Sequence, residues 1–402
     1  MSVITMETTN HTTDIPNFVR TMFLDGVNRR ASDIHIDPSI NEVRIRFRVD
    51  GSLAPYISFP MSYHDQLLTH LKVLSELNTT SVFTPQDGHF ALSFLYEDKD
   101  PAKNKPMVID IRISVFPTIY GDSAVFRITN SISHILSLDQ LGMDPVTLEK
   151  VRSITRRNNG MMLVTGPVGS GKTSALYAAL DETMTEDKNV ITLEDPVEFR
   201  FDKIRQIQMN PDRGLTFASG MKSVLRQDPD TIMIGEIRDA ETAEYAMRAA
   251  LVGRTVFSTL HSNSSTGTIA RLIDMNIEKS MIAYAINGVI STRLVKKNCE
   301  FCKVEYVPAQ EFLLHFKINP SEHHFVHGAG CEKCDNKGFF GRTGIFEVLE
   351  FDTKLRSMIV EGKSMADLEL YVATSGTKLL RADALEKVYS GITTLENIAI
   401  VL

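Results

Sequence analysis

The 402-residue sequence predicts an α/β protein. Its main domain should contain a largely parallel sheet, with a smaller α+β domain before it and a helical, cysteine-containing region after it. Three observations support this. Residues 166–173 read GPVGSGKT and match the phosphate-loop pattern GxxxxGK[ST]. From about residue 143 short apolar segments alternate with helix-like ones, whereas residues 14–130 read as strands in hairpin order. All the cysteines fall between residues 299 and 334.

Chain length, net charge and the distribution of apolar residues disfavour several classes of protein. A chain of 402 residues exceeds what one hydrophobic core usually organises, so more than one domain is expected. The formal net charge of -7 disfavours a protein that mainly coats nucleic acid. No apolar run is long enough for a transmembrane segment, and residues 1–14 are too polar for a secretory signal. We therefore expect a cytoplasmic protein.

The first domain is predicted over residues 14–130, after a flexible tail at residues 1–13. Its expected elements are helices at 15–30 and 63–77, strands at 43–49, 89–95, 108–115 and 124–128, a hairpin turn at 50–51 and a long hairpin loop at 97–105. In the strand at 43–49 apolar residues alternate with three arginines, which predicts one buried face and one charged face. The charged face could equally be a solvated sheet surface or part of a site.

The second domain is predicted over residues 143–402, after a linker at 131–142. Its strands are expected at 161–164, 190–193, 204–209, 231–234 and 255–258. After Ile277 the strand pattern fades, so we expect a cysteine segment at 296–340 and a mostly helical part at 341–402. The helices expected in that part cover 354–361, 365–372 and 379–389.

The phosphate loop follows an apolar strand and precedes a helix-like run, which is the order that phosphate binding requires. Its glycines permit backbone angles at which successive N–H groups converge on phosphate oxygens. Lys172 is expected to reach the β- and γ-phosphates, and Thr173 to hold Mg²⁺. The candidate nucleotide-binding residues are Gly166, Pro167, Val168, Gly169, Ser170, Gly171, Lys172, Thr173 and Ser174. A glycine-rich turn that binds nothing would not explain the fixed spacing of glycines, lysine and hydroxyl.

Two predicted strands end in acidic residues. Residues 194–198 read EDPVE, and Glu236 follows Gly235, which stands where phosphate-loop enzymes usually place a metal-binding aspartate. Because the carboxyl ends of parallel strands meet at one sheet edge, both acidic ends should lie beside the phosphate loop. The first segment could instead cap a turn. Hydrolysis requires a metal-holding acid and a group that activates water, which favours catalytic roles for Glu194 and Glu236.

The cysteines form two pairs with CxxC spacing: Cys299 and Cys302, then Cys331 and Cys334. Paired spacing favours a closed tetrahedral Zn²⁺ site over a disulfide framework or four free thiols. Histidines between the pairs could substitute for a cysteine, although four thiolates already complete the shell. Such a site could contribute on the order of 10 kcal/mol to ordering a segment with little core of its own.

Three segments resemble the conserved boxes of the secretion ATPase superfamily, the motors of type II secretion and type IV pilus systems. Residues 193–198 (LEDPVE) resemble its Asp box, 226–239 (RQDPDTIMIGEIRD) its atypical Walker B box and 258–263 (STLHSN) its His box. The similarity runs from residues 31–35 (ASDIH) to 342–347 (RTGIFE). This resemblance implies a PAS-like domain joined to a RecA-like ATPase domain, working as a homohexamer.

The resemblance also implies roles for individual residues. Lys172 and Thr173 would bind phosphate and Mg²⁺, Glu194 would activate water, and Glu236 would support the metal. His261 would sense the nucleotide state. Without the flanking match, His261 would read as a hydrogen-bonded histidine at a strand end.

In the first domain, Arg112 and Arg127 lie in segments that resemble those supplying arginines to the nucleotide. A guanidinium aimed at the γ-phosphate accelerates other phosphoryl transfers by about 10³ to 10⁵. Both arginines are therefore candidate charge stabilisers. The chain begins almost directly at this domain, and we expect the extra N-terminal docking domain of many assembly ATPases to be absent.

Within the superfamily a cysteine cluster is typical of assembly motors. The sequence thus predicts an ATPase that powers assembly of a type IV pilus or a type II secretion pseudopilus. It would work at the cytoplasmic side of the inner membrane on a polytopic platform protein. The alternatives are a pilus-retraction or conjugation-type ATPase, a nucleic-acid translocase and a non-catalytic scaffold. The cysteines disfavour the first, the acidic charge the second, and the intact Lys172, Glu194 and Glu236 the third.

Overall fold

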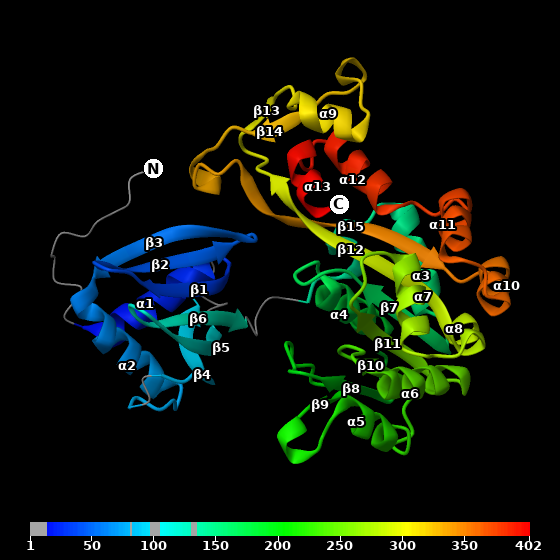
Figure 1. The fold of residues 1–402 in the computed structure, drawn as a ribbon, viewed down its shortest axis with the longest axis horizontal. Coiled ribbons are helices and arrows are strands. Elements are labelled where there is room, and N and C mark those ends of the chain that lie inside the picture. Colours follow the sequence, from blue (N-terminus) through cyan, green and yellow to red (C-terminus); the bar gives the residue numbers. More distant parts are fainter. Residues whose placement is uncertain (1–13, 81–82, 97–104, 130–134) are drawn as a thin grey trace. The chain divides into compact units, whose positions relative to one another are not determined.

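The computed structural model describes residues 14–80, 83–96, 105–129 and 135–402. The chain divides after His134 into two compact units (Figure 1). The predicted tail at 1–13 lies outside the described residues, as do residues 97–104 of the predicted hairpin loop and 131–134 of the predicted linker.

The first unit is built on a six-stranded antiparallel sheet in the order β3-β2-β1-β6-β5-β4. Its elements are α1 (Ile15–Asn28), β1 (Ala31–Pro38), β2 (Glu42–Val49), β3 (Ser52–Pro60), α2 (His64–Leu74), β4 (Gln86–Tyr96), β5 (Lys105–Thr118) and β6 (Gly121–Thr129). The helices and one face of the sheet share a hydrophobic core. The predicted antiparallel α+β organisation of this region is therefore present.

The alternation predicted in β2 is confirmed. Val43, Ile45 and Phe47 are buried in the core, while the intervening arginines are exposed or half-buried. The turn at residues 50–51 joins β2 to β3, and both of its residues have positive φ, +49° and +84°. Such angles match the twist of a two-residue hairpin, as the Asp-Gly pair predicts.

The second unit contains a seven-stranded sheet in the order β15-β12-β7-β11-β10-β8-β9, parallel except for β15. Its first elements are α3 (Pro145–Thr155), β7 (Gly160–Thr165), α4 (Lys172–Thr183), β8 (Val190–Glu194), β9 (Arg205–Gln208), α5 (Phe217–Val224), β10 (Thr231–Ile234), α6 (Ala240–Leu251), β11 (Thr255–Leu260), α7 (Ser265–Asp274) and α8 (Lys279–Ala285). The remaining elements are β12 (Ile286–Asn298), β13 (Lys303–Glu305), α9 (Gln310–Phe316), β14 (Val326–Gly328), β15 (Phe339–Glu350), α10 (Thr353–Glu361), α11 (Met365–Thr374), α12 (Leu380–Tyr389) and α13 (Leu395–Val401).

Alternate residues of the buried strands enter two hydrophobic layers on opposite faces of this sheet. Helices α5 to α8, α10 and α11 contribute to one layer, and α3 and α4 to the other. A parallel sheet covered on both faces explains why its strands read as continuous apolar runs. At the carboxyl edge of this sheet the chain leaves β7 through the phosphate loop and enters α4 (Figure 1).

The expectation that strands fade after Ile277 is wrong. Strands β12 and β15 pair with each other along most of their length, and β12 also pairs with β7 beneath the phosphate loop. The pattern concealed β12 because its buried stretch includes glycine, serine, threonine and arginine, which interrupt the apolar signal. The structure also places residues 135–142, predicted as linker, in the second unit, where Leu138 and Leu141 join the core.

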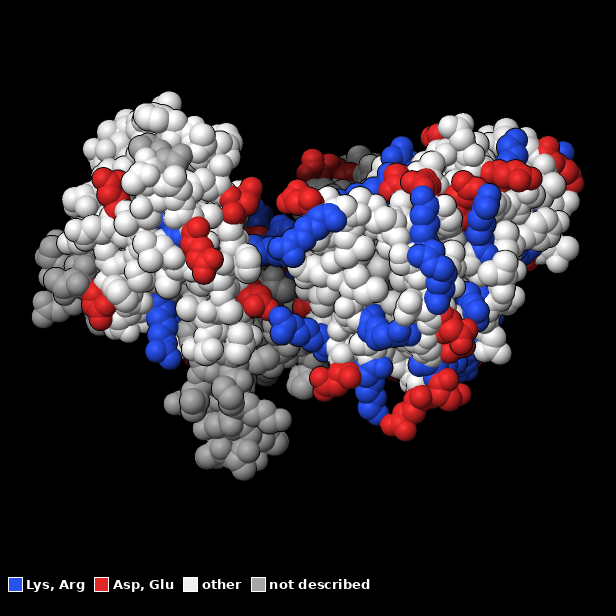
Figure 2. Space-filling view, turned by 90° about the horizontal axis from the view of Figure 1, so that it is seen from below, with Lys and Arg blue, Asp and Glu red and all other residues white. Residues whose placement is uncertain are grey.

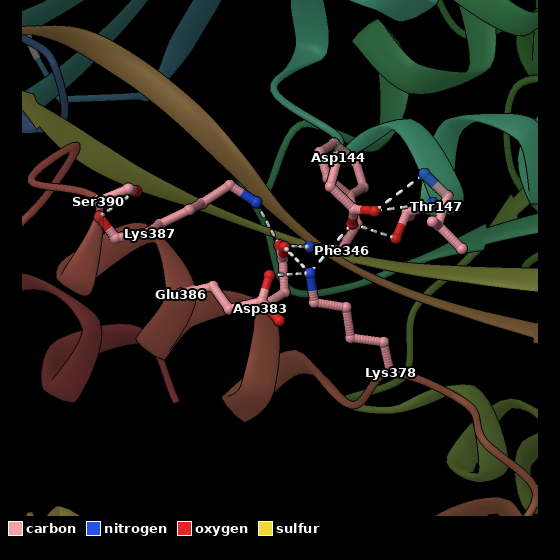
Figure 3. Close-up of polar contacts among 9 residues, drawn as sticks. Asp144, Thr147, Phe346, Lys378, Asp383, Glu386, Lys387 and Ser390 are labelled. Atoms are coloured by element: carbon pink, nitrogen blue, oxygen red, sulfur yellow. Dashed lines mark hydrogen bonds and ion pairs between the residues drawn. The ribbon is translucent and has the colours of Figure 1, made fainter.

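The C-terminal helices are fixed by a group of charged residues that we call the C-terminal anchor: Asp144, Lys378, Asp383, Glu386 and Lys387. In Figure 3 these side chains converge from the start of α3 and from α12 and the turn before it. Lys387 forms an ion pair with Asp383, which also accepts a 2.8 Å hydrogen bond from the backbone N–H of Phe346 on β15. Lys378 lies 3.0 Å from Asp144 and 3.3 Å from Asp383, and it also pairs with Glu386. The anchor therefore ties α12 to the sheet and to α3.

Candidate nucleotide-binding site

The phosphate loop has the geometry of an anion cradle. Gly169 and Gly171 have φ of +74° and +92°, which other residues rarely adopt. A Cβ atom on Gly166 would lie 2.4 Å from Ser170 Oγ and 2.6 Å from the carbonyl oxygen of Thr292, so that position has no room for a side chain. Gly171 precedes α4 without a side-chain cap, which leaves the first N–H groups of the helix available to an anion.

Lys172 opens α4 and is only 9% exposed. Its Nζ donates to the carbonyl oxygens of Gly166 and Pro167, each at 2.9 Å. Among the described residues no carboxylate lies within ion-pair distance of it. Burial lowers the pKa of Lys172, while Glu236 acts in the opposite direction. The hydroxyl of Ser170 is also buried, without a partner in the described chain. Both groups suit a phosphate ligand.

Glu194 ends β8 and is 2% exposed. Its carboxylate accepts hydrogen bonds from the hydroxyl of Tyr177, from Thr192 Oγ1 at 2.5 Å and from Gln206 Nε2 at 3.0 Å. All three donors are neutral, and in the described structure no lysine or arginine pairs with this carboxylate. The sequence did not single out Tyr177 or Gln206, because neither belongs to a recognisable motif.

Glu236 lies in a different environment, among charged side chains that follow the ends of neighbouring strands. Arg238 forms ion pairs with Glu236 and, at 3.3 Å, with Asp195. His261 Nε2 lies 3.4 Å from Glu236 Oε2. The structure therefore brings together the acidic ends of β8 and β10 and the histidine after β11, as the parallel-sheet argument predicts.

Arg293, on β12, is a charged residue of the site that the sequence reading missed. It is 8% exposed, and it donates to the carbonyl oxygens of Thr292 at 3.0 Å, Asn263 at 2.7 Å and Val401 at 3.1 Å. Burial lowers the pKa of Arg293, and its charge lies close enough to lower that of Lys172. It joins the strand beneath the phosphate loop to the loop after His261 and to the C-terminal helix.

Arg112 and Arg127 belong to the first unit, on the exposed face of its sheet. They are directly opposite each other on β5 and β6, and Arg127 is opposite Asp33 on β1. Arg127 Nε lies 3.3 Å from Asp33 Oδ1, and Arg48 Nε lies 3.6 Å from Asp33 Oδ2. The buried Asp33 thus orients Arg127 and Arg48 on this face.

The four cysteines meet in one cluster, as the paired spacing predicts. The Sγ atoms are 3.8 Å apart for Cys299 and Cys331, 3.9 Å for Cys302 and Cys334, and 3.7 Å for Cys331 and Cys334. A tetrahedron with metal–sulfur bonds of about 2.3 Å has edges of about 3.8 Å. Backbone N–H groups of Gly330 and Gly338 also donate to the sulfurs. The cluster can therefore hold one metal ion.

Charge on the second unit is mixed. Figure 2 shows lysine and arginine side chains interspersed with acidic ones over this unit. Its surface ion pairs include Lys203–Glu186, Lys222–Glu241 and Arg248–Glu244.

None of the helices in the described residues is long and apolar enough to cross a membrane.

A parallel sheet, an uncapped glycine-rich loop and acidic strand ends define a phosphate-loop nucleotide-binding protein. The family described as Type II/IV secretion system protein matches residues 8–400, and the chain belongs to this family. The resemblance found in the sequence is thereby confirmed.

Two relatives illustrate the similarity. The chain is 40% identical over 384 residues to the type IV pilus assembly ATPase PilB of Thermus thermophilus, covering 95% of this chain and 42% of that relative. It is 38% identical over 385 residues to the type II secretion system ATPase E of Vibrio cholerae, covering 96% of this chain and 74% of that relative. The chain therefore spans less than half of the first relative and about three quarters of the second.

Solved structures show the same fold. The Legionella pneumophila ATPase DotB aligns with a TM-score of 0.71 at 21% identity, covering 100% of this chain and 98% of that one. The pilus retraction motor PilT with bound ADP aligns with a TM-score of 0.59 at 23% identity, covering 95% and 96%. The predicted α/β ATPase fold is confirmed by these similarities.

Proposed function

We propose that this chain hydrolyses ATP to power assembly of a type IV pilus or a type II secretion pseudopilus. The observation that carries the proposal is the phosphate loop, where a buried lysine, with no carboxylate partner among the described residues, stands at an uncapped helix start. A nucleoside triphosphate supplies the negative charge that this arrangement lacks. The similarity to pilus assembly and type II secretion ATPases supports the particular process.

In this proposal the first N–H groups of α4 and the ammonium of Lys172 bind the phosphates, with Lys172 exchanging its two loop carbonyls for phosphate oxygens. Thr173 and Glu236 would hold Mg²⁺, which when bound neutralises charge on the phosphates. Glu194 would take a proton from the attacking water. Its neutral donors stabilise the ionised carboxylate that this role requires. His261, paired with Glu236, would report the nucleotide state.

The remaining assignments rest on the family resemblance together with the geometry. The first unit would be PAS-like, and its Arg112 and Arg127 would stabilise charge on the nucleotide. The chain would form a homohexamer on a polytopic platform protein, peripheral at the cytoplasmic side of the inner membrane. Nucleic acid is not an expected partner. The four cysteines would bind one structural Zn²⁺, which the tetrahedral spacing of their sulfurs supports.

The site assignment is tested by Mg²⁺-dependent ATP hydrolysis in Lys172→Ala and Glu194→Gln. Each variant should lose at least about 100-fold in turnover, since removing one charge-stabilising group from a phosphoryl-transfer or acyl-transfer site costs that much or more. Lys203→Ala, a surface variant, should behave as wild type. Full turnover in both site variants would rule out the assignment.

Hydrolysis that proceeds without DNA would separate this motor from a translocase.

Metal binding is tested by elemental analysis of protein purified without chelator, with one zinc per chain expected. Cys302→Ser together with Cys334→Ser should abolish the zinc and increase proteolysis of residues 299–338, because the metal contributes folding free energy to the segment that carries its ligands. Protein without metal that resists proteolysis as well as wild type would contradict the structural role.

A further inference from the structure

We propose that Tyr177 is a positioning residue for Glu194: its hydroxyl orients the carboxylate towards water and links it to the helix that binds the phosphates. The inference rests on the proposed function. The hydroxyl of Tyr177 donates to Glu194 Oε2. Tyr177 lies four residues after Thr173 on α4, so both side chains leave the same face of the helix.

The ring of Tyr177 is held rigidly. It is buried, packs edge-on against Phe199 with ring centroids 5.2 Å apart and stacks on Phe201 at 5.7 Å. Both phenylalanines follow Glu194 in the connection to β9. The chain that leaves the acidic strand end therefore folds back to enclose the tyrosine, and the direction of its hydroxyl is fixed by packing.

The two carboxylate oxygens of Glu194 are not equivalent. Oε1 accepts from both Thr192 and Gln206, whereas Tyr177 is the one donor to Oε2 among the described residues. A carboxylate oxygen accepts about two hydrogen bonds. Oε1 is therefore saturated, and Oε2 keeps one acceptor position. Oε2 is the atom that can take a proton from water, and Tyr177 sets its direction.

The tyrosine is suited to remain a donor. Burial raises the pKa of Tyr177, and the neighbouring Glu194 raises it further, so the hydroxyl keeps its proton throughout the working pH range. Gln206 is fixed in the same way, since its Nε2 also donates to the carbonyl oxygen of Phe199 at 2.8 Å and its Oε1 accepts from the N–H of Phe201 at 2.8 Å. The donors of Glu194 thus form one rigid shell.

The test compares Tyr177→Phe with a matched control, Tyr371→Phe, in the full-length chain. Tyr371 donates its hydroxyl to Asp352 on the C-terminal helices, so the control loses the same kind of bond elsewhere. In Tyr177→Phe, kcat should fall about 10- to 100-fold, the range for one hydrogen bond to a charged group, with KM for MgATP changed less than about threefold. Tyr371→Phe should match wild type in both kcat and KM.

Further variants separate positioning from packing. Thr192→Val removes one of two donors to Oε1 and should reduce kcat less than Tyr177→Phe does. In a Glu194→Gln background, Tyr177→Phe should cause no additional loss of the residual rate, since it acts through that carboxylate. A wild-type kcat in Tyr177→Phe, or an undiminished further loss in the double variant, would overturn the proposal. If Glu194→Gln itself keeps full activity, the proposed function of this site fails first.

Discussion

The candidate nucleotide site and the C-terminal anchor both contain buried charged side chains, but the partners of these charges differ. In the anchor, Asp383 and Lys387 are 2% and 6% exposed and neutralise each other, with Lys378 bridging to further carboxylates. In the site, Lys172 and Arg293 are bonded to carbonyl oxygens and Glu194 to neutral donors. Within the described chain none of these three groups forms an ion pair.

We propose that this difference separates the charges that serve the fold from those that a bound ligand would neutralise. A buried charge without an opposite partner is costly, so a protein retains it where something else completes it. Two buried cations and a loop of N–H groups are complementary to a triphosphate. The charges of the anchor are paired with one another, and its role is to hold α12 against β15 and α3.

The largest expected effect comes from breaking the anchor. Asp383→Ala leaves Lys387 buried without its main partner and removes the acceptor for the N–H of Phe346, so the free energy of unfolding should fall by about 3–5 kcal/mol. Denaturant titration measures the loss. Replacing the pair together, by Asp383→Leu and Lys387→Met, should recover much of it. A loss below about 1 kcal/mol in Asp383→Ala would mean that the pair contributes no more than a surface contact.

An intermediate effect is expected at Arg293. Arg293→Lys keeps the charge, but one ammonium cannot span the carbonyls of Thr292, Asn263 and Val401, which requires the planar guanidinium. We expect a stability loss of about 1–2 kcal/mol and weaker nucleotide binding, measured by denaturant titration and by nucleotide titration. Arg248→Lys, in a surface ion pair, is the control. If the two variants match in stability and nucleotide binding, Arg293 does not contribute to the site.

The smallest effect is expected at the surface. Glu186→Ala breaks a pair with Lys203 in which both side chains are more than 70% exposed. The change in stability should stay within about 0.5 kcal/mol, and ATP turnover should not change. Thermal unfolding at low and high salt checks this, and a larger, salt-dependent loss would show that surface charges contribute more than the comparison allows.

The sequence predicted those features that depend on local pattern. The phosphate loop, the acidic ends of β8 and β10 and the alternation in β2 follow from short-range spacing, and the structure has each of them. Strand β12 was missed because burial by neighbours, not its own apolar content, makes it a central strand. Tyr177 and Arg293 were missed because neither belongs to a recognisable motif and because Glu194, Asn263 and Val401 meet them only in the folded domain.

The anchor illustrates the same limit. Asp383 and Lys387 are spaced i, i+4 and read as an ordinary surface pair on a helix. Their burial comes from β15, which the sequence reading did not predict. Spacing identifies possible partners, whereas the contribution of an ion pair to stability depends on how deeply the fold buries it.

We propose that Lys172, which has no carboxylate partner among the described residues, is held for the nucleotide. Thermal unfolding of wild type and Lys172→Ala, each with and without a non-hydrolysable ATP analogue and Mg²⁺, tests it most directly. Without nucleotide the two proteins should differ by less than about 1 kcal/mol, because the lost hydrogen bonds and the relieved burial of charge offset each other. With nucleotide only wild type should be stabilised, by about 2.7 kcal/mol at 100 times its dissociation constant. A nucleotide-free variant as unstable as Asp383→Ala, or one stabilised equally by the analogue, would contradict the account.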